Sequence, residues 1–483
     1  LLLPYRKQSV VDRAEYGYDK RYMLEGSFGA TGSENFASGH RWGIFPAVGA
    51  AWYISHEKFM EPLENILSKL KLRASFGITG NDEIGSSSRF PYREALSTGG
   101  PGYNMGLTPG VNGDVTGAVG AGIIEQDFAT PNLTWERERK VNVGVDLGLF
   151  RGSIDLIVDW FHNRRNNILL RRKTIPSAAG FRNSPWQNFG VTTNTGFDAS
   201  LILKKQIGQV FASVRGNLTY AKNRVEEYDE VPQVYQYQAY TGQSIGQPFV
   251  YVAEGLYTPD DFDIVENADG SKTYTLKEGM PNPGTQVAPG DIKYKDLNGD
   301  KKIDSLDKTY ENGLYPEDPR LVYGFGLNLE WKGFFAGVFF QGVGQTSVNL
   351  LSSAGNFMPF HNGVDASSAR MEALDRWQNN DPYNQNVLFP RVHATKFDHN
   401  AYGSTWWYRN GSFLRLKNVE FGYQFNKQML RKISMQNLRI YVQGTNLAVW
   451  DNIEYWDPEL GGSNSGSKYP ICGTWTIGLE VTF

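Results

Sequence analysis

The chain has 483 residues, a formal net charge of −3, 14% aromatic residues and 53 glycines. With this charge and with scattered basic residues, nucleic acid is not an expected partner. No run of about 18 apolar residues occurs, which excludes a transmembrane helix, but barrel strands need an apolar residue only at every second position. The lone Cys472 excludes an internal disulfide, and the six histidines have no metal-ligand spacing.

Alternation of apolar with polar or small residues predicts about thirteen strands, bounded by clusters of Gly, Asn, Asp and Pro. Apolar residues at helical spacing predict a short amphipathic turn within residues 57–70, with Pro62 near its start. The strands are expected at residues 5–13, 22–32, 42–53, 71–80, 140–149, 154–160, 191–204, 209–223, 323–331, 334–345, 412–425, 438–450 and 473–483.

The two faces of these strands differ in chemistry. Residues 141–149 carry Val or Leu at each odd position and Asn, Gly or Asp between them. A charge at alternate positions is costly in a dry sandwich but normal beside a water-filled lumen. In residues 412–425 the apolar set changes phase after Leu416, which predicts a bulge or a strand that extends beyond the membrane. Residues 334–345 are partly apolar on both faces and leave their orientation open.

Long connections alternate with short ones along the chain. The long ones are expected at residues 81–134, 171–190, 224–318, 346–411 and 451–471. Outer-membrane barrels have short periplasmic turns and long extracellular loops, so the last strand should end in the periplasm. We therefore predict an all-β fold, a transmembrane antiparallel barrel of which this chain forms the carboxyl-terminal portion. Because Leu1 does not open a signal peptide, we expect a longer protein with a secretion signal upstream.

The final stretch, residues 473–483, places its apolar side chains on one face and ends on an aromatic residue. It resembles the closing strand of bacterial outer-membrane barrels. In those proteins the terminal aromatic residue is part of the assembly signal, a role that the resemblance implies for Phe483.

Six further segments resemble the SusC/RagA family of TonB-linked outer-membrane transporters. They are residues 41–48 (RWGIFPAV), 72–81 (LRASFGITGN), 132–136 (NLTWE), 290–300 (GDIKYKDLNGD), 412–419 (SFLRLKNV) and 455–459 (YWDPE), the last followed by Tyr469-Pro470. The resemblance implies a barrel of about 22 strands, with the plug domain and TonB box outside this chain. It also implies import of oligosaccharides or oligopeptides, driven through TonB, with a SusD-like lipoprotein over the extracellular mouth.

Residues 296–307 place oxygen donors at the positions of an EF-hand-like calcium loop. Lys301 replaces the usual glycine and position 12 is Asp rather than Glu, so a metal-free turn rich in Asp and Asn is the alternative. If calcium is bound, its role would be to order the longest loop. The ligands would be Asp296, Asn298, Asp300, Asp304, Asp307 and the carbonyl of Lys302.

Aromatic residues in the long loops are candidates for stacking on sugar rings or peptide side chains. The candidates are Tyr235, Tyr237, Tyr240, Trp377, Trp406 and Trp407. Packing inside the loops is the alternative, and it is favoured for Trp406 and Trp407 because they immediately precede a strand.

No catalysis is predicted. Residues 242–246 fit G-x-S-x-G, but no helix follows Ser244, as a nucleophile elbow requires. Asp260, Asp261 and Asp263 are adjacent acids in a polar loop, not a spaced catalytic pair. Two rivals stay open: a porin or adhesin of the outer membrane, and a secreted β-rich carbohydrate-active enzyme. The apolar rows argue against the second.

Overall fold

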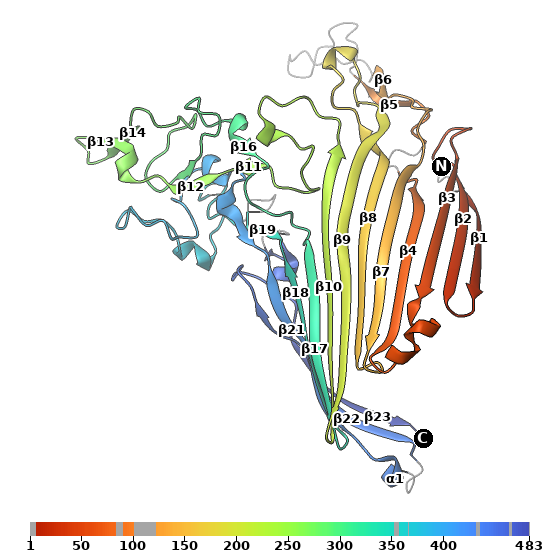
Figure 1. The fold of residues 1–483 in the computed structure, drawn as a ribbon. Coiled ribbons are helices and arrows are strands. Elements are labelled where there is room, and N and C mark those ends of the chain that lie inside the picture. Colours follow the sequence, from red (N-terminus) through yellow and green to blue (C-terminus); the bar gives the residue numbers. More distant parts are fainter. Residues whose placement is uncertain are drawn as a thin grey trace, which may run out of the picture. The chain divides into compact units, whose positions relative to one another are not determined.

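The computed structural model describes residues 6–83, 90–100, 122–351, 357–365, 367–430, 435–462 and 466–482. Within these residues thirteen long strands form one antiparallel sheet, in which each long strand pairs with the next one along the chain (Figure 1). They are β1 (Lys7–Tyr18), β2 (Tyr22–Ser33), β3 (Trp42–Tyr53), β4 (Leu67–Asn81), β7 (Glu136–Leu149), β8 (Ile154–Arg171), β9 (Trp186–Ile207), β10 (Val210–Glu227), β17 (Leu321–Trp331), β18 (Phe334–Gly344), β21 (Phe413–Gln424), β22 (Asn437–Trp450) and β23 (Thr474–Thr482). The predicted all-β antiparallel fold is confirmed.

The chain divides into two compact units. Unit 1 comprises Leu1–Phe197 and Lys222–Pro232, and unit 2 comprises Asp198–Ala221 and Gln233–Phe483. Unit 1 also contains the hairpin β5 (Ala95–Gly100) and β6 (Gly122–Asp127).

Tight turns in unit 1 join the strands at one end. Asp19 and Lys20 both have positive φ, as do Phe150 and Arg151, the backbone form that matches the right-handed twist of the strands in a tight hairpin. The first turn corrects the sequence prediction, which ended the strand at residue 13. Here β1 continues to Tyr18, which pairs with Tyr22, because the three residues between them suffice to reverse the chain.

The connection from β3 to β4 also departs from the prediction. The predicted short turn takes the form of two 3-10 turns, Ile54–His56 and Lys58–Leu63, and ends before residue 67. Pro62 has no backbone N–H and cannot continue a helical ladder, and residues 67–70 join β4 instead, opposite β7.

Unit 2 confirms the predicted bulge. Against β18 the register of β21 shifts between Leu416 and Asn418, where Lys417 is the extra residue, and against β22 two residues, Asn446 and Leu447, stand opposite Lys417. The ambiguous strand β18 is also settled. Phe340 pairs with Phe325 and Val338 with Leu327, which places its even-numbered side chains on the apolar face.

The long connections of unit 2 form small ladders outside the sheet. These are β11 (Val250–Tyr251) with β16 (Lys308–Thr309), β12 (Ala253–Leu256) with β15 (Ile292–Tyr294), β13 (Phe262–Glu266) with β14 (Lys272–Leu276), and β19 (Ser347–Asn349) with β20 (Tyr408–Asn410). A buried apolar cluster that includes Ile292, Leu350 and Trp407 packs residues of β11, β12, β15 and β19 together, and Phe262 of β13 belongs to a second cluster. We call this set of ladders the loop layer of unit 2.

Helices are short in the described residues. The α-helix α1 covers Lys427–Leu430, and none of the described helices is long and apolar enough to cross a membrane. The remaining 3-10 turns are Ser177–Ala179, Gln236–Gln238, Pro259–Asp261, Ser305–Asp307, Met371–Leu374, His399–Ala401, Thr405–Trp407 and Pro458–Leu460.

Candidate functional site

The sheet of unit 1 exposes its apolar face. Val143 and Val145 on β7 are 47% and 36% exposed. Their cross-strand neighbours continue the row, since Val145 pairs with Leu72 on β4 and with Val158 on β8. An apolar face that is this exposed across several strands needs an apolar environment.

The opposite face of the same strands carries paired charges. Arg73 Nε lies 3.0 Å from Asp146 Oδ1, and its Nη2 lies 2.6 Å from Asp159 Oδ2. Lys69 Nζ adds a contact of 3.3 Å to Asp146. Asp146 is buried, but the side chains of Arg73 and Lys69 remain 31% and 44% exposed, so this face meets water through its basic residues.

Unit 2 repeats the division between faces. On β17, Phe325, Leu327 and Leu329 are exposed, and Trp331 continues the row. The register carries this face through β18 and β21 to Val442 on β22 and Ile477 on β23.

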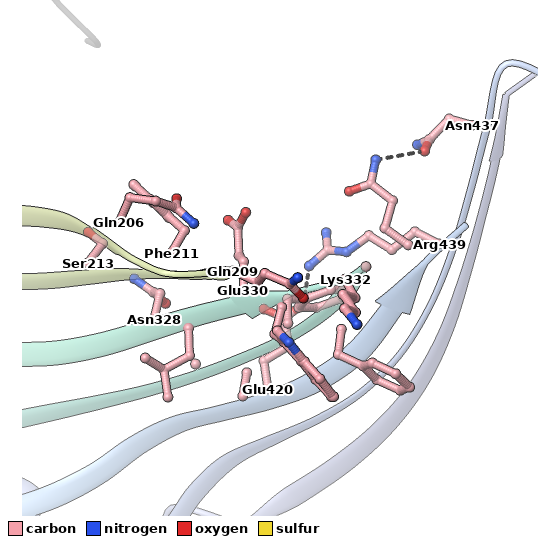
Figure 2. A pocket seen from close by; sticks show the side chains of 18 of the residues that line it. Gln206, Gln209, Phe211, Ser213, Asn328, Glu330, Lys332, Glu420, Asn437 and Arg439 are labelled. Atoms are coloured by element: carbon pink, nitrogen blue, oxygen red, sulfur yellow. Dashed lines mark hydrogen bonds and ion pairs between the residues drawn. The ribbon is translucent and has the colours of Figure 1, made fainter. Parts of the chain in front are cut away.

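The polar face of unit 2 contains a hollow of about 720 Å³ (Figure 2). Arg439 on β22 is part of its lining: its guanidinium pairs with Glu420, and its Nη1 is 3.9 Å from Glu480. The guanidinium also lies over the ring of Phe335, 4.3 Å from the ring centroid. This cation–π contact covers an aromatic ring that would otherwise stand on a polar surface. Glu330 adds a further carboxylate to the lining, so the hollow is hydrophilic and mixed in charge.

Aromatic side chains mark the ends of the exposed apolar face. In unit 1 Tyr18, Tyr22 and Trp52 stack in sequence near the tight turns, with ring centroids 6.5 and 6.3 Å apart. Trp42 lies at the other end of β3. In unit 2 Trp331 stacks on Phe334 beside the turn between β17 and β18. Such belts sit at the two water interfaces of a membrane protein.

A buried carboxylate organises the loop layer of unit 2. Asp291 is fully buried and accepts two hydrogen bonds from Arg391, at 3.1 and 2.7 Å. His393 Nε2 donates to it at 2.7 Å, and Asn400 Nδ2 and the backbone N–H of Ala288 donate at 2.9 Å. Burial alone would raise the pKa of Asp291, but the donors from His393 and Arg391 hold it below its usual value. The network connects segments about 100 residues apart, so sequence reasoning did not identify it.

The candidate tryptophans are packing residues of this layer. Trp407 is fully buried and Trp377 nearly so. The indole N–H of Trp407 donates to the Asn400 carbonyl at 3.0 Å, and that of Trp406 to the Leu388 carbonyl at 3.1 Å. Trp377 packs onto Gly290, whose positive φ and missing Cβ permit the close approach. This burial favours the packing alternative over ligand stacking.

The candidate tyrosines lie beside the candidate calcium loop. Tyr235 and Tyr237 are half-buried and stack with ring centroids 5.2 Å apart, while Tyr240 packs against Tyr310. The Tyr237 hydroxyl donates to the Leu306 carbonyl at 2.8 Å. The structure therefore brings together two candidate sites that the sequence analysis treated separately.

The acids of residues 296–307 are satisfied by their own loop. Both oxygens of Asp296 accept backbone N–H groups, from Gly299 at 2.7 Å and Lys301 at 2.9 Å. Asp307 is buried and accepts from Leu297 and Asp304. Burial raises the pKa of Asp307.

The remaining sequence candidates, Asn298, Asp300 and Asp304, likewise accept backbone N–H groups, and Lys302 pairs with Asn282. Across the described parts of the chain no three His, Cys, Asp or Glu side chains gather as a metal site. Calcium binding by this loop stays a prediction.

The other sequence candidates are held in structural contacts. Ser244 sits in a turn, and its hydroxyl accepts from Arg320 at 2.8 Å. Asp261 caps the turn that starts at Thr258 and pairs with Lys293 at 3.0 Å, and Asp260 accepts from the Tyr383 hydroxyl. Phe483, the predicted assembly signal, lies outside the described residues.

Taken with the aromatic belts, a sheet that is apolar on one face and ion-paired on the other defines the wall of a transmembrane β-barrel. A family model described as "TonB dependent receptor-like, beta-barrel" matches residues 13–447, and the chain belongs to this family. Its place is the bacterial outer membrane.

Named relatives agree with this assignment. TonB-dependent receptor P3 of Formosa agariphila is 27% identical over 500 residues, which cover 98% of this chain and 45% of that protein. TonB-dependent receptor SusC of Bacteroides thetaiotaomicron is 24% identical over 481 residues, covering 98% and 43%. The chain thus spans about half the length of the curated relatives it matches.

A solved structure of the RagAB peptide transporter has the same fold over 99% of this chain and 48% of the solved chain. The TM-score is 0.71 and the sequence identity 22%. A second structure, of the RagAB peptide importer in its "open-open" state, gives a TM-score of 0.71 at 21% identity.

Proposed function

We propose that the chain forms the carboxyl-terminal wall of a SusC/RagA-type transporter that imports oligosaccharides or oligopeptides with energy from TonB. The observation that carries this is the division between an exposed apolar face and a hydrated, ion-paired face in both units. A wall of this kind suits a wide aqueous lumen, since its polar face offers charges of both signs. The plug and TonB box would come from upstream sequence.

The loop layer of unit 2 is the proposed contact region for substrate and for a SusD-like lipoprotein. Its support is a hydrophobic core and a buried ion network, which hold the loops in a defined form. Tyr235, Tyr237 and Tyr240 are the proposed aromatic contacts, because half-buried rings can still offer a face to a sugar or a peptide side chain. The similar solved structures are titled peptide transporters, and this supports peptides over oligosaccharides as the proposed substrate class.

The test uses the whole protein in its native cell envelope. Deleting its gene should abolish growth on one class of oligomer as sole nutrient, either oligosaccharide or oligopeptide, and so should deleting TonB. A SusD-like lipoprotein should co-purify in mild detergent. Uptake that persists without TonB would instead identify a passive porin, and no uptake defect with either class would leave the adhesin alternative.

A further inference from the structure

The connection between β3 and β4 is unlike the other connections at its end of the sheet. The turn at Asp19–Lys20 and the turn at Phe150–Arg151 are tight, whereas residues 54–66 insert two 3-10 turns (Figure 1, the coiled segment beside the start of β4). Three apolar side chains of this segment are exposed: Phe59 by 65%, Leu63 by 45% and Ile66 by 54%. Exposed apolar residues this close together indicate a surface that something covers.

A buried carboxylate fixes where the segment lies. Glu57 Oε1 accepts from the Tyr22 hydroxyl at 2.5 Å and from the Trp52 indole N–H at 3.0 Å. Its Oε2 accepts from Arg21 Nη1 at 2.9 Å. Tyr22 pairs with Trp52 across the ladder, on the same face as exposed Leu24. Glu57 therefore binds the segment to the apolar, outward side of the wall and not to its polar face.

The depth of the segment follows from the same contacts. Tyr18, Tyr22 and Trp52 form the aromatic belt at the tight-turn end, and such belts lie at the level of lipid headgroups. The Phe150 N–H donates to the Ile66 carbonyl at 2.7 Å, which joins the segment to the next turn, where Phe150 is itself exposed.

We propose that residues 57–66 are a lipid-binding foot, whose Phe59, Leu63 and Ile66 side chains enter the periplasmic leaflet at the boundary between headgroups and acyl chains. The occupant is phospholipid, because this apolar patch is continuous with the lipid-facing surface of β2 and β3 and lies at belt depth. Lys58, Glu61 and Glu64 are exposed on the same short segment and can stay in the headgroup water. The foot would hold this part of the wall at one depth, and it does not depend on which substrate is imported.

The test places one fluorophore at a time on the foot of the whole protein in phospholipid vesicles. Cys472 is exposed and is first replaced by Ser, after which Phe59→Cys and the matched control Glu61→Cys are labelled with an environment-sensitive dye. At position 59 we expect emission at shorter wavelength and quenching by spin-labelled lipid. At position 61 we expect aqueous emission and quenching by iodide.

Two results would overturn the proposal. Aqueous emission at position 59, with the same iodide quenching as at position 61, would show that the segment stands free of the membrane. Protection of position 59 from both quenchers would show that protein covers it, either another part of the chain or a periplasmic partner.

Glu57 is proposed as the positioning residue for the foot. Glu57→Ala should reduce lipid quenching at position 59 while the barrel keeps its heat-modifiable mobility in gels. Glu57→Gln should restore the quenching, because its amide oxygen can still accept from Tyr22 and Trp52. Unchanged lipid quenching in Glu57→Ala would remove Glu57 from this role.

Discussion

Replacing Asp291 by Ala should open the loop layer of unit 2 while the barrel strands stay folded. Arg391, His393, Asn400 and the backbone of Ala288 donate to this buried carboxylate at 2.7–3.1 Å. Removing one partner of a buried ion pair costs about 3–5 kcal/mol, because the remaining charge is left without an acceptor. The cost falls on the loops, since all these groups lie outside the thirteen long strands.

Protease added to vesicles that contain the whole protein measures the opening. When the loops reclose faster than they are cut, the cleavage rate follows the population of the open form. A cost of about 3–5 kcal/mol therefore predicts cleavage roughly 10²- to 4 × 10³-fold faster within residues 228–320 and 345–412. The control is Asp398→Ala, which removes a 58% exposed carboxylate paired with Lys396 at 2.9 Å. An exposed pair of this kind contributes about 0–1 kcal/mol.

Equal cleavage of the Asp291→Ala and Asp398→Ala proteins would refute the role given to the buried network. Loss of heat-modifiable mobility in the Asp291→Ala protein would also refute it, because the damage would then have reached the barrel. The double variant Asp291→Ala/Arg391→Ala supplies an internal check. If the two groups act as a pair, it should cost less than the sum of the single changes.

Leu327→Arg on the exposed apolar face should destabilise the barrel by about 2–4 kcal/mol if Leu327 lies near the bilayer midplane, measured by urea unfolding in vesicles, whereas Asn328→Arg on the polar face should cost little. Equal costs would mean that the two faces are assigned incorrectly. Burial opposes ionisation of Asp229, but hydrogen bonds from Arg172 and from Lys173 and Thr174 lower its pKa to about 2. Because the folded value lies below the ordinary Asp value of about 3.9, the stability that Asp229 contributes should be present above about pH 4 and be lost as pH falls toward 2. Asp229→Asn should flatten that part of a stability–pH curve. Asp307→Ala should make residues 296–307 more sensitive to protease, because the N–H groups of Leu297 and Asp304 lose their acceptor, and the increase over the unchanged protein should be the same in EDTA and in calcium. If calcium instead protects this loop of the unchanged protein and not of the variant, the calcium prediction is supported.

The strands could be predicted because their information is local. Alternation along residues 141–149 or 323–331 requires only the two-residue period of a strand, and the bulge at Lys417 shows as a change of phase within one segment. Strand ends were less certain, because a turn as short as Asp19–Lys20 leaves almost no compositional signal. The short turn predicted within residues 57–70 is present, but it ends earlier than the apolar spacing indicated, because that spacing continues where the 3-10 turn runs into β4.

The candidate site could be predicted only where its chemistry was local. The segment at residues 290–300 was recognisable, yet nothing near it indicates that Asp291 binds Arg391 and His393 about 100 positions later. Likewise the sequence marked Trp377 and Trp407 as aromatic loop residues, and only packing decided that they are buried.

By itself, then, the order of apolar and polar residues determined that this chain is a two-faced antiparallel sheet of membrane-barrel type. That holds because each strand must offer one face to lipid and one to water whatever its neighbours are. Only the tertiary structure decided how the long loops pack, which charges meet and on which side of the wall the foot lies. Those outcomes depend on contacts between distant segments, and a pattern of neighbouring residues carries no record of them.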